Sequence, residues 1–177
     1  ILITTVNFVV SVEVNFYPKY RNYYSLFNDK GAIGDIQQVG KEMRKVLNME
    51  LKYTALKQLL MTALAISVGG FLLNTLPLGF NDRMEGYFRT LCVGYGLYAV
   101  ANTMLLLLLY FTDYQGALWL SGIFAAGTSV FTVFSLFFPK VYYGFGFLIG
   151  CGIFFLLAVI RLDAYTRKLP YYILSVQ

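Results

Sequence analysis

Hydrophobic positions along the chain gather into four long runs without a charged residue, at 58–81, 90–112, 114–139 and 141–160. About 20 apolar residues in a helix cross a 30 Å hydrocarbon core, because each residue rises about 1.5 Å. Each run reaches that length. The alternation of a membrane β-strand is absent from them, as the five consecutive leucines 105–109 show. The pattern predicts an all-α, polytopic transmembrane helix bundle with four complete spans over residues 58–162.

A fifth uncharged run, residues 1–12, is too short to cross a bilayer alone. It has no initiating Met and no basic flank, so it does not match a signal peptide. We expect it to be the end of a truncated transmembrane helix, which makes the chain the C-terminal part of a longer membrane protein.

Residues 13–57 carry most of the charge and divide at a turn signal, Asn28 to Gly31. Before this turn, Pro18 suits a first helical turn. The aromatic residues that follow share one helical face. They fit either an interfacial aromatic belt or a stacking platform for sugar rings. These residues are Phe16, Tyr20, Tyr23, Tyr24 and Phe27.

After the turn, the spacing of Asp35 and Gln38 resembles a capping box. An apolar stripe from Ile36 to Leu47 then has charged residues on the other side of the helix. This pattern predicts an amphipathic helix that lies on the inner leaflet and leads into the span near Lys57. A docking face for a calmodulin-like or other cytoplasmic partner is the alternative.

Composition supports lipid as the solvent, since 58% of the residues are hydrophobic and only 13% are charged. Histidine is absent, which removes the commonest general base and metal ligand. We therefore expect that the chain is not an enzyme and that it has no catalytic residue, cofactor or metal site. The net charge of +5 is scattered between apolar blocks, so it indicates a membrane surface and no nucleic acid.

The basic residues also predict the orientation. Eight of the 14 Lys and Arg residues lie between Lys19 and Lys57, and three more lie from Arg161 onward. Cytoplasmic segments carry an excess of Lys and Arg. If residues 13–57 are cytoplasmic, the spans alternate so that the tail 163–177 is cytoplasmic too, and eleven of the 14 basic residues lie inside.

A few polar or small residues interrupt the apolar segments. Glu13 follows the first run and is a candidate for a cavity or for the headgroup region. Asp113, in a short link, fits a loop cap better than a site. Gly146 and Gly150 form a small-xxx-small pair typical of close helix packing, and Gly69–Gly70 fits a kink or hinge.

Several short stretches resemble a known family. The first are Glu13-Val14-Asn15-Phe16-Tyr17, Tyr20-Arg21-Asn22-Tyr23-Tyr24 and Gly34-Asp35-Ile36. Later ones are Leu109-Tyr110-Phe111 with Asp113 and Ala117-Leu118-Trp119, and Tyr142-Tyr143-Gly144-Phe145-Gly146 leading to Arg161-Leu162-Asp163. In this order and spacing, the chain is similar to the C-terminal portion of the PelG-type membrane subunit of the Pel exopolysaccharide export system.

The resemblance implies the superfamily of multidrug, oligosaccharidyl-lipid and polysaccharide flippases, which are helix bundles with a cavity that opens to alternate sides. It implies multi-pass insertion in the cytoplasmic membrane and export of an amino-sugar polymer. It also implies a cytoplasmic glycosyltransferase and other export-complex membrane subunits as partners, besides lipid and polysaccharide. Candidate residues along the substrate path are Asn7, Glu13, Tyr20, Tyr23, Tyr24, Asn74 and Asn102.

Two other functions remain open at this point. One is transport of a different substrate, such as a drug or a lipid-linked oligosaccharide. The other is a membrane scaffold that anchors a cytoplasmic glycosyltransferase through residues 16–50.

Overall fold

The computed structural model describes residues 2–28, 33–75, 82–139 and 143–168, and nearly all of them are helical. No strand occurs within these ranges. The all-α prediction is therefore confirmed. The predicted turn at Asn28–Gly31 lies largely outside the described residues.

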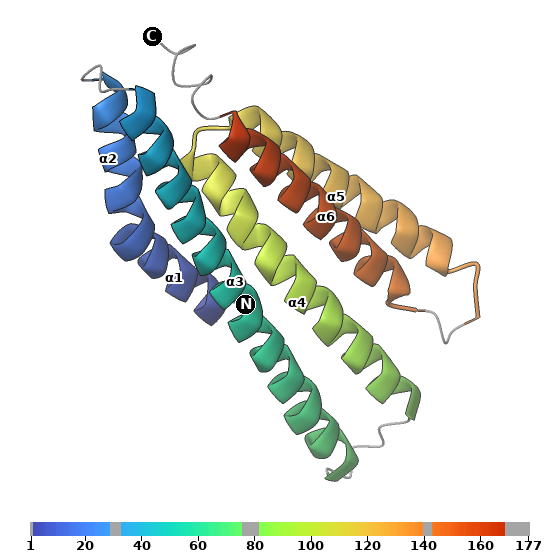
Figure 1. The fold of residues 1–177 in the computed structure, drawn as a ribbon. Helices are drawn as coiled ribbons and strands as arrows, with labels where there is room; N and C mark the ends of the chain where they lie inside the picture. Colours follow the sequence, from blue (N-terminus) through green and yellow to red (C-terminus); the bar gives the residue numbers. More distant parts are fainter. Residues whose placement is uncertain (1, 29–32, 76–81, 140–142, 169–177) are drawn as a thin grey trace. The chain divides into compact units, whose positions relative to one another are not determined.

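The described ranges contain six α-helices and one π-helical turn, whose arrangement is drawn in Figure 1. Four of the helices have stretches long and apolar enough to cross a membrane, which confirms the predicted number of spans. The helical segments that contain these stretches are Gln38–Thr75, Met84–Tyr110, Tyr114–Ser135 and Phe145–Arg167. The elements are α1 (Leu2–Ser11), η1 (Val12–Phe16), α2 (Tyr17–Asn28), α3 (Ile33–Thr75), α4 (Asp82–Tyr110), α5 (Tyr114–Ser135) and α6 (Phe145–Arg167).

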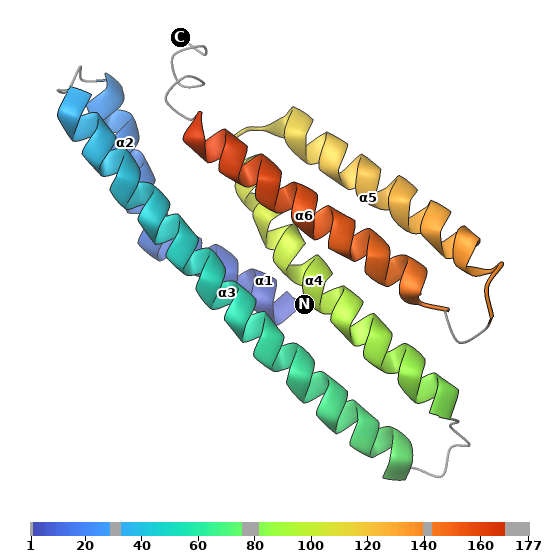
Figure 2. The ribbon, with the colours of Figure 1, turned by 45° about the vertical axis from the view of Figure 1, so that its right-hand side comes forward.

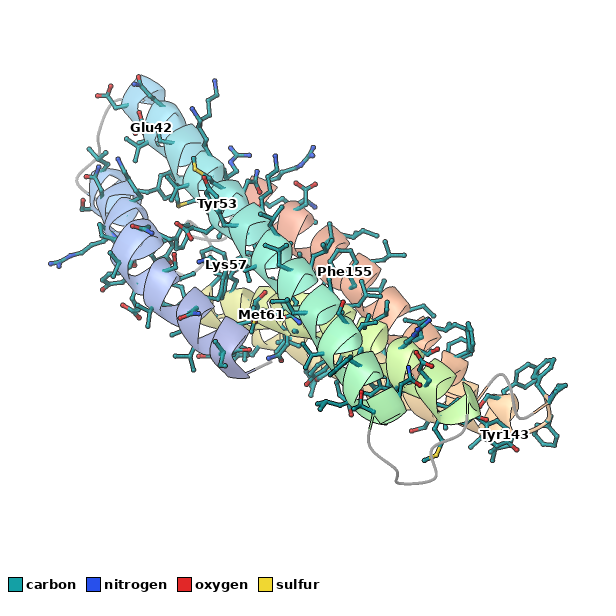
Figure 3. The ribbon with its side chains drawn as sticks, turned by 90° about the horizontal axis from the view of Figure 1, so that it is seen from below. Glu42, Tyr53, Lys57, Met61, Tyr143 and Phe155 are labelled. Atoms are coloured by element: carbon teal, nitrogen blue, oxygen red, sulfur yellow. The ribbon has the colours of Figure 1, made fainter. Side chains whose placement is uncertain are left out.

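The described residues form two compact units, and each is treated by itself. We call residues 2–57 the N-terminal hairpin and residues 58–168 the span bundle. Helix α3 contributes to both, since it runs unbroken for 43 residues. Figure 3 shows the order of Glu42, Tyr53, Lys57 and Met61 along it. Lys57 is the last charged residue of α3.

In the N-terminal hairpin, α2 lies beside the first part of α3 (Figures 1 and 2). The apolar stripe of α3 is buried here, with Met43 1% and Leu47 2% exposed. Gly40 lets the Tyr23 ring approach, because a Cβ at that glycine would lie 3.0 Å from the ring. The stripe predicted to face the inner leaflet is thus covered by the chain's own helices.

In the span bundle, α6 packs against both α4 and α5 (Figures 1 and 2). Helices α4 and α6 supply most of the buried side chains. The buried apolar side chains of α4 are Ala99, Val100, Ala101, Met104, Leu107 and Leu108, and those of α6 are Cys151, Phe154, Ala158, Leu162 and Tyr165. Burial of these apolar side chains holds α4, α5 and α6 together.

The small-xxx-small pair on α6 lets this helix lie close to α5. A Cβ at Gly146 would lie 2.5 Å from the Phe131 carbonyl oxygen of α5. A Cβ at Gly150 would lie 2.4 Å from Thr128 Cγ2. The predicted role of the pair in close helix packing is confirmed.

Gly69 and Gly70 lie inside α3, which continues through them without a break. The Phe88 ring of α4 occupies the space beside Gly69, since a Cβ there would come within 2.3 Å of it. The glycine predicted to form a hinge thus accommodates a neighbouring aromatic ring.

Candidate functional site

A small polar cluster joins the two legs of the N-terminal hairpin. The Glu50 carboxylate of α3 accepts a hydrogen bond from the Ser11 hydroxyl and another from Asn15 Nδ2 at 2.9 Å. Asn15 Nδ2 also donates to Ser11 Oγ at 3.3 Å. Asn7 precedes Ser11 by one helical turn. By this spacing exposed Asn7 shares one edge of the hairpin with the three bonded residues. The serine and asparagine side chains of this edge both donate and accept hydrogen bonds, and the Glu50 carboxylate accepts them.

The cluster lies at the π-helical turn η1. Tyr17 N–H donates to the Val12 carbonyl, five residues back. Pro18 comes next and has no N–H, and its ring would clash with the carbonyl four residues earlier in an α-helix. The wider turn before Pro18 relieves that clash. Single π-turns of this kind occur often at functional sites.

Glu13 lies within the same turn but on a different face. Its side chain is exposed, whereas Ser11 and Asn15 bond to Glu50. Glu13, which the sequence analysis selected, is therefore not the acidic residue of the polar cluster. That residue is Glu50.

The tyrosines of α2 differ in exposure. Tyr23 is 2% exposed and packs on Gly40, so its ring offers no stacking face in this structure. Tyr24 is 45% exposed, and Tyr20 is half-buried between its ring contacts with Phe16 and Tyr24. The single aromatic face predicted from spacing is therefore divided between the hairpin core and its surface.

Burial raises the pKa of Tyr20 and Tyr23 above the ordinary value of 10.0; nearby Tyr24 adds to the rise at Tyr20, and Arg44 opposes it at Tyr23. The folded hairpin then holds more phenolic protons than the unfolded chain does. Below pH 10 we expect the ionisation of these tyrosines to leave the stability of the hairpin unchanged. Above pH 10 the stability should fall as the pH rises. Helix melting followed from pH 8 to 11.5 measures this. Tyr23→Phe should flatten the alkaline decline, and an unchanged decline would contradict the assignment.

A second polar group ties together α4, α5 and α6 of the span bundle. Arg161 Nε donates to Asp113 Oδ2 at 2.8 Å, and Arg161 Nη2 donates to Asp113 Oδ1 at 2.9 Å. Asp113 also accepts from the Gly116 N–H at 3.1 Å, which makes it the N-cap of α5. The predicted cap is confirmed, with an ion pair in addition.

Further contacts surround the Asp113–Arg161 pair, at the place that we call the Asp113–Arg161 corner. Tyr165 of α6 donates its hydroxyl hydrogen to the Phe111 carbonyl at 3.0 Å, and their rings stack. Thr112 has a left-handed backbone (φ 65°) at the end of α4, where glycine is usual. A Cβ at Gly116 would collide with the Asp113 carboxylate. The link between α4 and α5 is thereby fixed to the last turns of α6.

The remaining predicted path residues are spread over the span bundle. Asn74 is exposed near the end of α3, and Asn102 is half-buried in the second half of α4. The structure does not bring these two together. Asn7, by contrast, shares an edge with Ser11, Asn15 and Glu50.

Sequence analysis missed Glu50 and Arg161, although each makes the main polar contact of its unit. A local signal existed for the polar face that Glu50 meets, because Asn7, Ser11 and Asn15 recur every four residues, but not for Glu50 itself. No local signal identifies Arg161 as the partner of Asp113, since the two lie 48 residues apart. Within the described ranges, no group of three or more potential metal-ligating side chains occurs.

Comparison with known proteins gives the family. A family model, PelG, described as "Putative exopolysaccharide Exporter (EPS-E)", matches residues 1–174. The chain belongs to the PelG family. Neither the curated proteins nor the solved structures contain a significant match. Membership in PelG assigns the chain to a transporter-type family of exopolysaccharide export, and its four apolar helices fit a multi-pass membrane protein.

Proposed function

We propose that this PelG chain forms part of the wall of a path that carries an amino-sugar exopolysaccharide across the cytoplasmic membrane. The observation that carries the proposal is the match to an exporter family over nearly the whole chain, together with four helices suited to membrane spans. A bundle that opens alternately to the two sides would move the polymer without exposing it to lipid.

A sugar polymer needs a hydrated path lined with polar groups, because each hydroxyl left without a partner in hydrocarbon costs a few kcal/mol. The edge formed by Asn7, Ser11, Asn15 and Glu50 supports this role, since its groups can exchange hydrogen bonds with sugar hydroxyls. Exposed Glu13 and Tyr24 add a negative charge and an aromatic face for a cationic amino sugar. Tyr20, Asn74 and Asn102 are further candidates.

The proposed orientation has residues 13–57, at the cytoplasmic entrance of the path, and the C-terminus on the cytoplasmic side. Eleven of the 14 basic residues then lie on the cytoplasmic side, as membrane insertion favours. A glycosyltransferase on that side would deliver the growing polymer, and other membrane subunits of the export complex would assemble around the path.

We expect Glu50→Gln and Glu13→Gln to reduce secreted polymer severalfold when they replace the wild-type protein in a strain deleted for it. Glu50→Gln removes the carboxylate that accepts hydrogen bonds from Ser11 and Asn15. Glu13→Gln removes the negative charge that would attract a cationic sugar. Glu42→Gln is the matched control, because Glu42 makes only an exposed ion pair with Lys19. Secreted polymer is measured at equal membrane levels of each variant. Full secretion by Glu13→Gln would remove Glu13 from the path.

The deletion strain itself tests the function. Loss of secreted polymer with an active synthase in lysates is the expected result. Continued secretion would point to a different substrate. Recovery of secretion by residues 16–50 on an unrelated membrane anchor would point to a scaffold.

A further inference from the structure

A groove of about 500 Å³ runs between α5 and α6. Its size is within the range of small-molecule sites. Both walls belong to the span bundle, and the groove begins near the Asp113–Arg161 corner. It is lined by Gln115, Gly116, Trp119, Leu120 and Ile123 of α5 and by Leu157, Ile160, Arg161 and Ala164 of α6.

The groove is polar at one end and apolar along the rest. Gln115 and Arg161 lie at the end where α5 begins and α6 approaches its last turns. Ile123 lies eight residues further along α5, about 12 Å deeper at 1.5 Å per residue. Since α5 is a candidate span, the groove descends from one membrane boundary toward the bilayer centre. A lipid has the same gradient of polarity.

Large apolar side chains are exposed at this groove. Trp119 is 73% exposed, Ile160 63% and Ile123 42%. In helices that cross a membrane, such surface meets acyl chains, and Trp is favoured near the headgroups. The groove walls are therefore suited to hold one acyl chain along its length.

The last turns of α6, just beyond the polar end of the groove, carry net positive charge. Asp113 balances Arg161, and Asp163 balances Arg167 through an exposed ion pair. Lys168 follows Arg161 by seven residues, two helical turns along the same face, and is exposed. Basic side chains at a membrane boundary attract anionic headgroups.

We infer that this groove is a binding site for an anionic phospholipid of the membrane, with an acyl chain between Trp119 and Leu157 and the headgroup at the Arg161 end, where the positive charge of Lys168 attracts it. The experiments below measure bound lipid, so they do not depend on the transported substrate.

The first experiment fills the groove. Ile123→Trp places a large ring where the acyl chain would lie, whereas Val133→Trp adds the same ring to an exposed position of α5 outside the groove. Protein purified from its membrane in mild detergent is analysed by native mass spectrometry. Wild type and Val133→Trp should retain phospholipid, and Ile123→Trp should retain at least fivefold less. Equal retention by all three, or none in the wild type, would overturn the site.

The second experiment tests the headgroup without changing the groove. In nanodiscs that mix phosphatidylglycerol with phosphatidylcholine, the wild type should be enriched in bound phosphatidylglycerol. Lys168→Gln should lower that enrichment about fivefold, which corresponds to about 1 kcal/mol for one basic side chain at an anionic surface. No preference for phosphatidylglycerol in the wild type, or an unchanged preference in Lys168→Gln, would overturn the assignment of an anionic lipid.

Discussion

Gly146→Ala is expected to force α5 and α6 apart and to lower the stability of the span bundle by about 3 kcal/mol, the upper end of the usual cost of overpacking. The added methyl would lie 2.5 Å from the Phe131 carbonyl oxygen and 2.7 Å from the Thr132 nitrogen. Both are backbone atoms, which cannot rotate aside as a side chain can. Thermal unfolding in detergent, followed by circular dichroism, measures the loss.

Gly152→Ala is the matched control on the same helix. A Cβ at Gly152 meets nothing within 4 Å, so only the gain in helix propensity remains. Alanine in place of a helical glycine stabilises by roughly 0.5–1 kcal/mol. The two substitutions should therefore shift the melting temperature in opposite directions. A similar shift for both would show that α5 and α6 are not in close contact at Gly146.

Arg161→Leu is expected to destabilise the span bundle by about 3 kcal/mol, the lower end of the cost of breaking a buried ion pair. It leaves the Asp113 carboxylate, 8% exposed, without its countercharge. The reciprocal change, Asp113→Asn, should cost less. Asparagine remains a good N-cap for α5, and the Arg161 side chain, 42% exposed, can reach water or headgroups.

Thermal unfolding of the two single variants and of the double variant measures the coupling between Asp113 and Arg161. The double variant should be more stable than Arg161→Leu alone, since no buried charge is then left unpaired. Arg167→Leu serves as the control, because its pair with Asp163 is exposed on both sides and should contribute at most about 1 kcal/mol. Additive losses in the double variant would contradict a coupled pair.

Features that depend on local sequence were predictable. The cap at Asp113 follows from an acidic residue just before a helix, and the packing role of Gly146 and Gly150 follows from their spacing. The amphipathic stripe of α3 was also recognisable from its period. The sequence did not predict what covers this stripe. A hydrophobic period identifies the face of a helix that avoids water, but it does not tell whether lipid or another helix covers that face.

The uncharged runs alone predict a lipid environment and four spans, because the cost of placing a charge in hydrocarbon applies to each residue and limits where charges occur. Which polar groups meet depends on the folded structure. Ser11 and Glu50 lie 39 residues apart, and Asp113 and Arg161 lie 48 apart. Such pairs form where helix packing brings two faces together, and that packing is a property of the whole fold.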